Sequence, residues 1–335
     1  MDKQGMRAVA IAAMLWLAIG KAGAQQNIQF TQYIFNSLSV NPGYAGYKEE
    51  WFAQMAFRDQ WSGIDGAPRT GQFSVDGVLG AGKNTGVGLQ VTSDRLGAQS
   101  ATSAYANYAY RLRLDAYDTK RLSFGIGAGV TQYGLDGEKL LGVNPVDPTV
   151  PVGKISNLIP DIRVGVYYYA PKWYLGASVM DLLSGDGSNN IFRWDANSIT
   201  NLMRKRHMYL IGGALVDFEG GLKLRPSVMV MEDFRGPTNI DLNAMFIFAG
   251  KLWLGGGYRM SLNVWDRAYA AGQDLQRSNS FSGIAQVYVT DRLRVGYSYD
   301  HILSKLSSVQ NGTHEITLGL TFPRRGERLI SPRFF

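Results

Sequence analysis

After its first 24 residues, the chain repeatedly alternates apolar residues with small or polar ones. From Leu122 to Thr131 the even positions are apolar, and the odd positions are Ser, Gly or Thr. The residues from Ile316 to Phe322 follow the same rule. Because successive side chains of a strand point to opposite faces, each segment predicts a β-strand with one apolar face and one small or polar face.

About fourteen segments of this kind follow one another, and most have the length that a tilted strand needs to cross a bilayer. Strands of soluble sandwiches and propellers average only about 5–6 residues, so that alternative is disfavoured. The pattern predicts an all-β protein, a transmembrane antiparallel β-barrel of about 14 strands over residues 50–322. The segments lie near 50–58, 69–79, 84–93, 101–114, 120–132, 160–170, 172–181, 206–217, 222–231, 237–249, 251–261, 279–289, 291–300 and 312–322.

The lengths of the connections alternate as well. Every second connection is short, and the opposite set contains the long ones, as in outer-membrane barrels with short periplasmic turns and long external loops. The short connections are Gly80–Lys83, Asp115–Thr119, Pro171-Lys172, Phe218–Gly221, Gly250-Lys251 and Thr290-Asp291; the longest of the others are 134–159, 182–205, 262–278 and 301–311.

Residues 1–24 have the form of a signal peptide. Lys3 and Arg7 precede an apolar run from Ala8 to Ile19, and Ala22-Gly23-Ala24 supplies small residues for cleavage. The run is short for a spanning helix, although a membrane anchor or a buried helix is the alternative. With the barrel pattern, this segment predicts export to the outer membrane.

Residues 25–49 form an N-terminal extension that is rich in aromatic residues and too short to be a domain. Phe30, Tyr33, Phe35 and Tyr44 need a protected environment, and the glycine-rich inner wall leaves room for another segment. We therefore expect the extension to plug or line the lumen, or to lie at its periplasmic mouth.

A C-terminal tail of residues 323–335 follows the last strand on the periplasmic side. It ends in Arg333, Phe334 and Phe335, which either dock in a groove or belong to a disordered end.

Composition limits the chemistry. The chain has no Cys, which excludes disulfide scaffolds, Cys-ligated zinc and thiol catalysis. It has only three His, which makes a His-rich metal centre unexpected. The adjacent pairs Asp300/His301 and His314/Glu315 face opposite sides of their strands and are poorly placed for catalysis. We predict no enzyme activity, no cofactor and no metal, with loop calcium as a weak alternative. The net charge of +7 suits anionic lipid head groups or a protein partner, and nucleic acid is not expected.

Two aromatic groups are candidates for membrane-interface girdles, because Tyr and Trp favour the border between lipid and water. Ordinary packing is the alternative for each ring. The groups are Tyr105, Tyr108 and Tyr110, and Tyr167, Tyr168, Tyr169, Trp173 and Tyr174, the second being expected on the periplasmic side.

Five loop residues are candidate anchors for a protein partner, because aromatic residues dominate interface hot spots. Packing within the loops is the alternative for each of them. They are Trp61, Ile64, Phe192, Trp194 and Trp265. A substrate-specific channel and, less favoured, an outer-membrane lipid enzyme are the rival functions.

Several blocks along the chain resemble the PorP/SprF family of outer-membrane proteins of Bacteroidota, which is associated with type IX secretion and gliding motility. Gly43 and Asp59 stand where the family often has Ala and Asn. The blocks are Gln29-Phe30-Thr31-Gln32-Tyr33, Asn41-Pro42-Gly43-Tyr44-Ala45-Gly46, Arg58-Asp59-Gln60-Trp61, Gly66-Ala67-Pro68, Phe73-Ser74-Val75, Tyr297-Ser298-Tyr299-Asp300, Leu306-Ser307-Ser308, Gly312-Thr313-His314-Glu315-Ile316 and Pro332-Arg333-Phe334-Phe335.

The resemblance implies a non-enzymatic component of the type IX secretion and gliding machinery. It implies two kinds of partner: an exported surface protein, received or anchored through its C-terminal signal domain, and an OmpA-like peptidoglycan-binding lipoprotein with periplasmic secretion subunits. The sequence leaves these two roles open.

Overall fold

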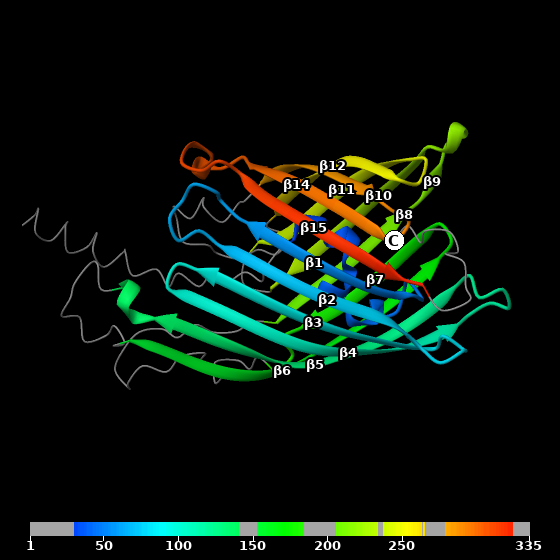
Figure 1. Cartoon of the computed structure of the whole chain (residues 1–335), viewed down its shortest axis with the longest axis horizontal. Helices are drawn as coiled ribbons and strands as arrows, with labels where there is room; N and C mark the ends of the chain where they lie inside the picture. The colour runs from blue at the N-terminus through cyan, green and yellow to red at the C-terminus, as the bar shows by residue number, and fades with distance from the viewer. Residues whose placement is uncertain are drawn as a thin grey trace, which may run out of the picture.

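The computed structural model describes residues 30–140, 153–183, 206–233, 237–262, 264 and 279–323. Its strands form one closed antiparallel barrel, which confirms the predicted fold (Figure 1). The strands are β1 (Trp51–Asp59), β2 (Arg69–Leu79), β3 (Thr85–Leu96), β4 (Gln99–Arg113), β5 (Arg121–Asp136), β6 (Lys154–Ala170), β7 (Trp173–Met180), β8 (His207–Ala214), β9 (Val216–Asp217), β10 (Lys223–Glu232), β11 (Thr238–Phe248), β12 (Leu252–Leu262), β13 (Ser280–Tyr288), β14 (Leu293–Ile302) and β15 (Thr313–Phe322).

Each strand pairs with its neighbours in the sequence, and β15 pairs with β1 to close the ring. β8 and β9 are two parts of one strand, interrupted at Leu215. The Leu215 N–H is donated to the carbonyl of Lys172 (2.8 Å), while Pro226 of the neighbouring β10 has no N–H for the ladder. Counted in this way, the barrel has the fourteen strands that the sequence predicts.

The two ends of the barrel differ as predicted, and we call them the short-turn end and the long-loop end. β1 begins at the short-turn end and β15 finishes there. At the long-loop end β5 and β6 run further than expected: β5 continues to Asp136 and β6 begins at Lys154. A small apolar cluster explains the extra length, because Leu135 packs there with Tyr133, Ile155 and Ile159, among others.

The two faces of the wall differ in polarity. Exposed apolar side chains such as Met55, Phe124 and Leu318 cover the outside, and buried polar ones such as Gln54, Ser123 and Thr317 line the inside. This is the apolar-out, polar-in alternation of membrane barrels. Among the described residues, no helix is long and apolar enough to cross a membrane.

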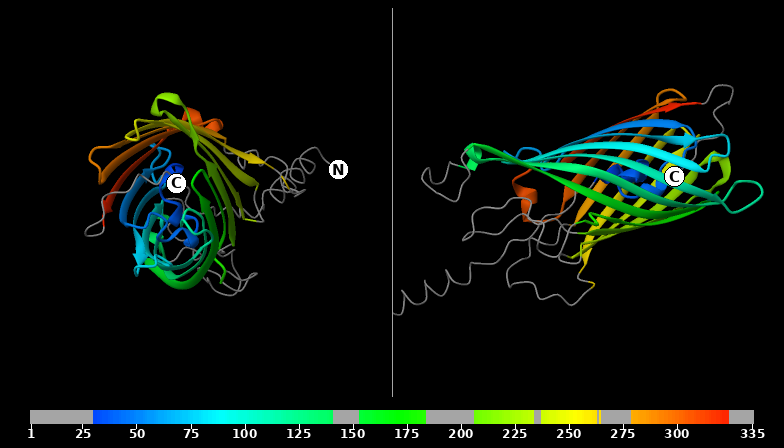
Figure 2. Two further views of the ribbon diagram at one scale, coloured as in Figure 1. Left: turned by 90° about the vertical axis from the view of Figure 1, so that its right-hand side faces the viewer. Right: turned by 90° about the horizontal axis from the view of Figure 1, so that it is seen from below.

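Residues 30–49 lie inside the ring, and we call them the lumenal segment (Figure 2). Short 3₁₀ helices shape it: η1 (Thr31–Phe35), η2 (Ser37–Ser39) and η3 (Pro42–Tyr44). Elsewhere the described residues form η4 (Gly137–Leu140), η5 (Glu219–Gly221) and η7 (Lys305–Ser308). The apolar side chains of the lumenal segment contribute a large part of the buried hydrophobic core.

The expected aromatic girdle is only partly correct. Tyr168 and Trp173 face outward and are in ring contact, with centroids 4.6 Å apart. Tyr167, Tyr169 and Tyr174 instead point into the lumen and are buried. Strand alternation is the reason, because Tyr169 and Tyr174 are paired across β6 and β7 and therefore share a face.

The first aromatic group divides in the same way. Tyr105 is buried inside the barrel, whereas Tyr108 and Tyr110 are exposed on its outside.

Candidate functional site

The candidate site is the contact between the lumenal segment and the inner wall. The segment enters at Glu49, beside the short turns, and runs along the lumen to Thr31, near the outer ends of β1, β14 and β15. The described part of the extension thus lies within the lumen along most of its length, not at the periplasmic mouth alone (Figure 2).

Near the long-loop end, Glu315 of β15 holds the backbone of the segment. Its two carboxylate oxygens accept the N–H groups of Thr31 and Gln32, each at 2.9 Å. Arg58 of β1 donates to Glu315 at 3.0 Å and to Asp300 of β14 at 2.8 Å. The Thr31 hydroxyl completes the group by donating to Asp300 at 2.6 Å. All these groups are buried, so every bond replaces one that water would otherwise supply.

Closer to the short-turn end, arginines near the beginnings of β10 and β14 hold carbonyl groups of the segment. Arg225 of β10 donates to the Ile34 carbonyl at 3.0 Å, and Arg294 of β14 donates to the Phe35 carbonyl at 2.7 Å. The Phe35 ring packs edge-on against Trp253 of β12, with centroids 5.6 Å apart. A buried guanidinium needs such acceptors, so the wall and the segment satisfy each other.

A row of small wall residues lets the backbone of the lumenal segment lie directly against the inner wall. Strand register places Gly86, Ala109, Gly125, Gly165 and Ser178 side by side on β3 to β7. A Cβ on Gly86 would overlap the Ala45 carbonyl, and a Cβ on Gly125 would overlap the backbone of Pro42 and Gly43. Glycine is required here because the backbone of the segment lies directly on the wall.

Asn41 fixes the turn that lies on this row. Its side-chain oxygen accepts the Gly43 N–H at 2.8 Å and so caps η3, which begins with Pro42. Its amide nitrogen donates to the wall carbonyls of Val166 and Ala177, at 2.9 and 3.3 Å. Asn41 therefore joins the local fold of the segment to β6 and β7.

A cluster of tyrosines packs beside this turn. Tyr44 and Tyr47 of the segment meet the inward-facing rings of Tyr167 and Tyr169, with centroid separations from 4.8 to 5.8 Å. Offset and edge-to-face contacts of this kind add to the stabilisation from apolar burial.

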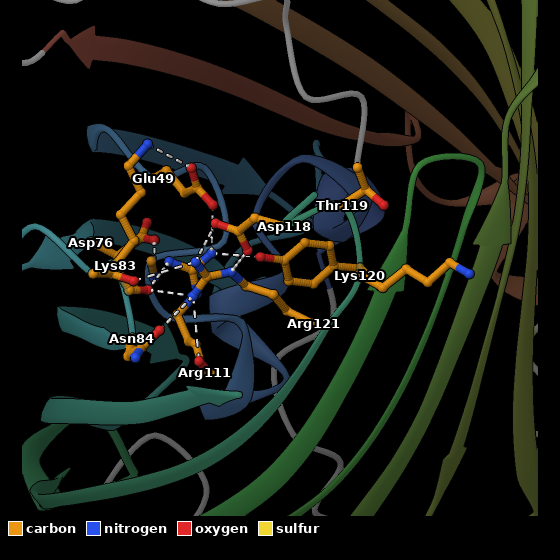
Figure 3. A network of polar contacts seen from close by, with 12 residues as sticks. Glu49, Asp76, Lys83, Asn84, Arg111, Asp118, Thr119, Lys120 and Arg121 are labelled. Atoms are coloured by element: carbon orange, nitrogen blue, oxygen red, sulfur yellow. Dashed lines mark hydrogen bonds and ion pairs between the residues drawn. The ribbon is translucent and has the colours of Figure 1, made fainter. Parts of the chain in front are cut away.

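A polar network holds the other end of the segment, at the short turns (Figure 3). The Glu49 carboxylate pairs with Lys83 at 3.1 Å and with Arg111 at 3.3 Å. Arg121 donates to the Lys83 carbonyl at 2.8 Å and to both oxygens of Asp118. The hydrogen bond from Arg121 holds the pKa of Asp118, which lies in the β4–β5 turn, below its usual value.

The structure brings some of the predicted residues together and separates others. Phe30, Tyr33, Phe35 and Tyr44 are all buried in the lumen. Trp61 and Ile64 are half-buried in the β1–β2 loop, where Trp61 N–H donates to the Thr313 hydroxyl at 3.2 Å. Phe192, Trp194, Trp265, Arg333, Phe334 and Phe335 lie outside the described residues, as does the signal peptide.

Sequence reasoning missed the roles of Arg58, Asp300 and Glu315, although each stands in a block that carries the family resemblance. The missing signal was the alternation of side chains along each strand: all three are charged residues at inward positions of strands whose outward positions are mostly apolar. A charged residue at such a position needs a buried partner.

The three histidines have different surroundings. His207 lies inside the barrel with Nδ1 at 3.3 Å from Asp181, and His314 lies outside with Nδ1 at 2.8 Å from the Tyr297 hydroxyl. His301 is exposed, whereas the adjacent Asp300 is buried, so the two face opposite sides as expected. Within the described ranges, no three acidic or histidine side chains gather in a way that could hold a metal ion.

A closed ring with an apolar outer face and a polar lumen defines an integral membrane protein with the fold of outer-membrane β-barrels. The chain belongs to the family of type IX secretion system membrane proteins PorP/SprF, whose family model matches residues 22–320. No curated protein matches the chain.

Solved outer-membrane barrels share the fold. The toluene transporter TbuX of Ralstonia pickettii has 12% sequence identity and a TM-score of 0.50, with 86% of this chain and 93% of that chain covered. The CymD monoaromatic hydrocarbon channel has 11% identity and a TM-score of 0.51, with 90% and 94% covered. At these identities the likeness concerns the fold alone.

Proposed function

We propose that this protein is a plugged outer-membrane component of the type IX secretion and gliding machinery, and that it attaches other proteins and forms no open pore. The short-turn end faces the periplasm and the long-loop end faces the cell surface. The partners are an exported surface protein, held through its C-terminal signal domain, and periplasmic secretion subunits with an OmpA-like peptidoglycan-binding lipoprotein.

One observation carries the proposal: the chain's own segment is bonded to the wall at both ends and along its middle. Glu315 holds it near the long loops, and the Glu49 network holds it at the short turns. Between them, Arg225 and Arg294 bond the carbonyls of Ile34 and Phe35. Asn41 bonds the middle of the segment to β6 and β7. An open porin leaves its lumen to water. A lumen filled in this way favours a role in which the two ends of the barrel contact other proteins.

Conductance in planar bilayers tests the plug. The wild-type protein should conduct little, and a variant without residues 25–46 should conduct several-fold more. Circular dichroism of both proteins should retain the β-sheet spectrum, which establishes that the deletion has folded. A folded deletion variant with wild-type conductance would contradict the plug.

Affinity purification from gently solubilised outer membrane tests the partners. Recovery of the C-terminal part of a surface protein supports anchoring, and recovery of a periplasmic lipoprotein supports a link to the secretion subunits. Recovery of neither, from membranes that hold the folded barrel, would count against an attachment role.

A substrate-specific channel is the second candidate, favoured by the fold likeness to a transporter and a channel for aromatic hydrocarbons. It predicts uptake defects with normal display of surface proteins when the gene is deleted. The attachment role predicts the reverse.

A further inference from the structure

A small polar pocket lies between the lumenal segment and strands β11 to β14, near the long-loop end. It has room for a group of about the size of one water molecule. Its lining includes Thr31, Asp241, Arg259, Ser280, Ser282 and Asp300. Most of the side chains offer oxygen atoms.

Asp300 presents an unused acceptor in this pocket. Its Oδ2 accepts from Thr31 and from Arg58, at 2.6 and 2.8 Å. Its Oδ1 is buried, and within the described part of the chain no donor lies within hydrogen-bonding distance of it. The residue is only 3% exposed, so bulk water does not replace the missing donor.

The charges around the pocket do not balance. Arg259 neutralises Asp241 through two bonds of 2.7 Å. Arg58 is shared between Asp300 and Glu315, so one positive charge faces two negative ones. The buried group of five residues therefore carries one net negative charge, which favours a single positive charge nearby.

We propose that this pocket binds a small monovalent cation, and that ammonium suits it best because it donates hydrogen bonds to oxygen. The cation contacts Asp300 Oδ1, with the hydroxyl groups of Ser280 and Ser282 as further ligands. The size of the pocket excludes large organic cations. By balancing the excess buried negative charge, the bound cation stabilises the arrangement in which Asp300 holds Thr31, and so the outer end of the lumenal segment.

The test is the thermal unfolding midpoint of the full-length protein in detergent, followed by intrinsic fluorescence at constant ionic strength. Ammonium, potassium and sodium chloride are compared with the chloride of N-methylglucamine, a cation too large for the pocket. The midpoint in at least one small cation should exceed that in N-methylglucamine by about 2 °C or more. Equal midpoints in all salts would overturn the proposal.

Three variants separate binding from general salt effects. Asp300→Asn should lose the cation response, and Ser282→Ala should weaken it without touching the Arg58 pair. Asp94→Asn is the matched control, because Asp94 also bonds a threonine hydroxyl but does not line the pocket. A full response in both pocket variants, or a lost response in Asp94→Asn, would overturn the site.

Methylammonium identifies the source of the cation. A response equal to that of ammonium supports the pocket as one that accepts a primary ammonium group, the chemistry of a lysine head group. A response to ammonium or potassium without methylammonium supports the pocket as a site for free ions.

Discussion

At the scale of single residues, several polar groups of the inner wall form hydrogen bonds with the lumenal segment. Arg58 is one of these groups, with bonds to Thr31, Asp300 and Glu315. A nearby surface pair offers a comparison, because Arg69 binds Asp59 at 2.9 Å while its own side chain is 71% exposed. Buried and exposed ion pairs respond differently to the loss of a partner, since only the buried charge is left without water.

We therefore predict different effects for Arg58→Gln and Arg69→Gln. The first leaves two buried carboxylates without their cation and should lower the free energy of unfolding by about 3–5 kcal/mol. The second should cost at most about 1 kcal/mol. Urea unfolding of the barrel in detergent measures both. Equal losses in the two variants would contradict the role given to Arg58.

At the scale of elements, the small-residue row on β3 to β7 decides where the segment can lie. The row exists only because strand register aligns one residue from each of five strands. A change of one residue in register would turn the row to the outside. The fit between η3 and the wall is thus a property of strand pairing as well as of composition.

The glycine at the centre of the row gives the next prediction. Gly125→Ala places a methyl group against the backbone of Pro42 and Gly43 and should destabilise the protein by about 1–3 kcal/mol. It should also make residues 30–49 more accessible to protease. Gly71→Ala is the control, because no described atom lies within 4 Å of its added Cβ. A lumenal segment equally protected in both variants would contradict this close approach.

Much of the fold could be predicted from the sequence. The two-residue alternation of apolar and polar side chains identifies the strands, and the lengths of the connections distinguish the two ends of the barrel. The contacts of the site could not, since Thr31 and Glu315 are brought together by ring closure and not by spacing. The inward turn of Tyr167 and Tyr169 was missed for a related reason: the rings that they contact, Tyr44 and Tyr47, precede every strand. The local pattern predicts that the extension enters the lumen, but not which wall residues it contacts there.

At the scale of the whole molecule, the barrel is a filled cylinder with two different ends. The short-turn end carries the Glu49 network, and the long-loop end carries Trp61 and Ile64 in a loop tied to the Gly312 carbonyl by the Ser62 N–H at 2.8 Å. Because the interior is occupied, the proposed function leads us to expect contacts with other proteins on the loops and turns, where aromatic residues contribute most.

This gives a prediction for the loops. Trp194→Ala combined with Trp265→Ala should reduce retention of the partner at the cell surface several-fold, since each truncation removes a candidate anchor. Fluorescent antibody against the partner on intact cells measures retention, and unchanged amounts of folded barrel serve as the control. Normal retention would remove these two residues from the proposed interface.

β15 has two structural roles. Its backbone closes the ring on β1, and its Glu315 side chain grips the first residues of the lumenal segment. The lumenal segment, which precedes every strand in the chain, is therefore bonded by the final strand. Closing the seam and bonding Thr31 and Gln32 both require β15, so a chain without β15 lacks the seam and this one attachment of the segment.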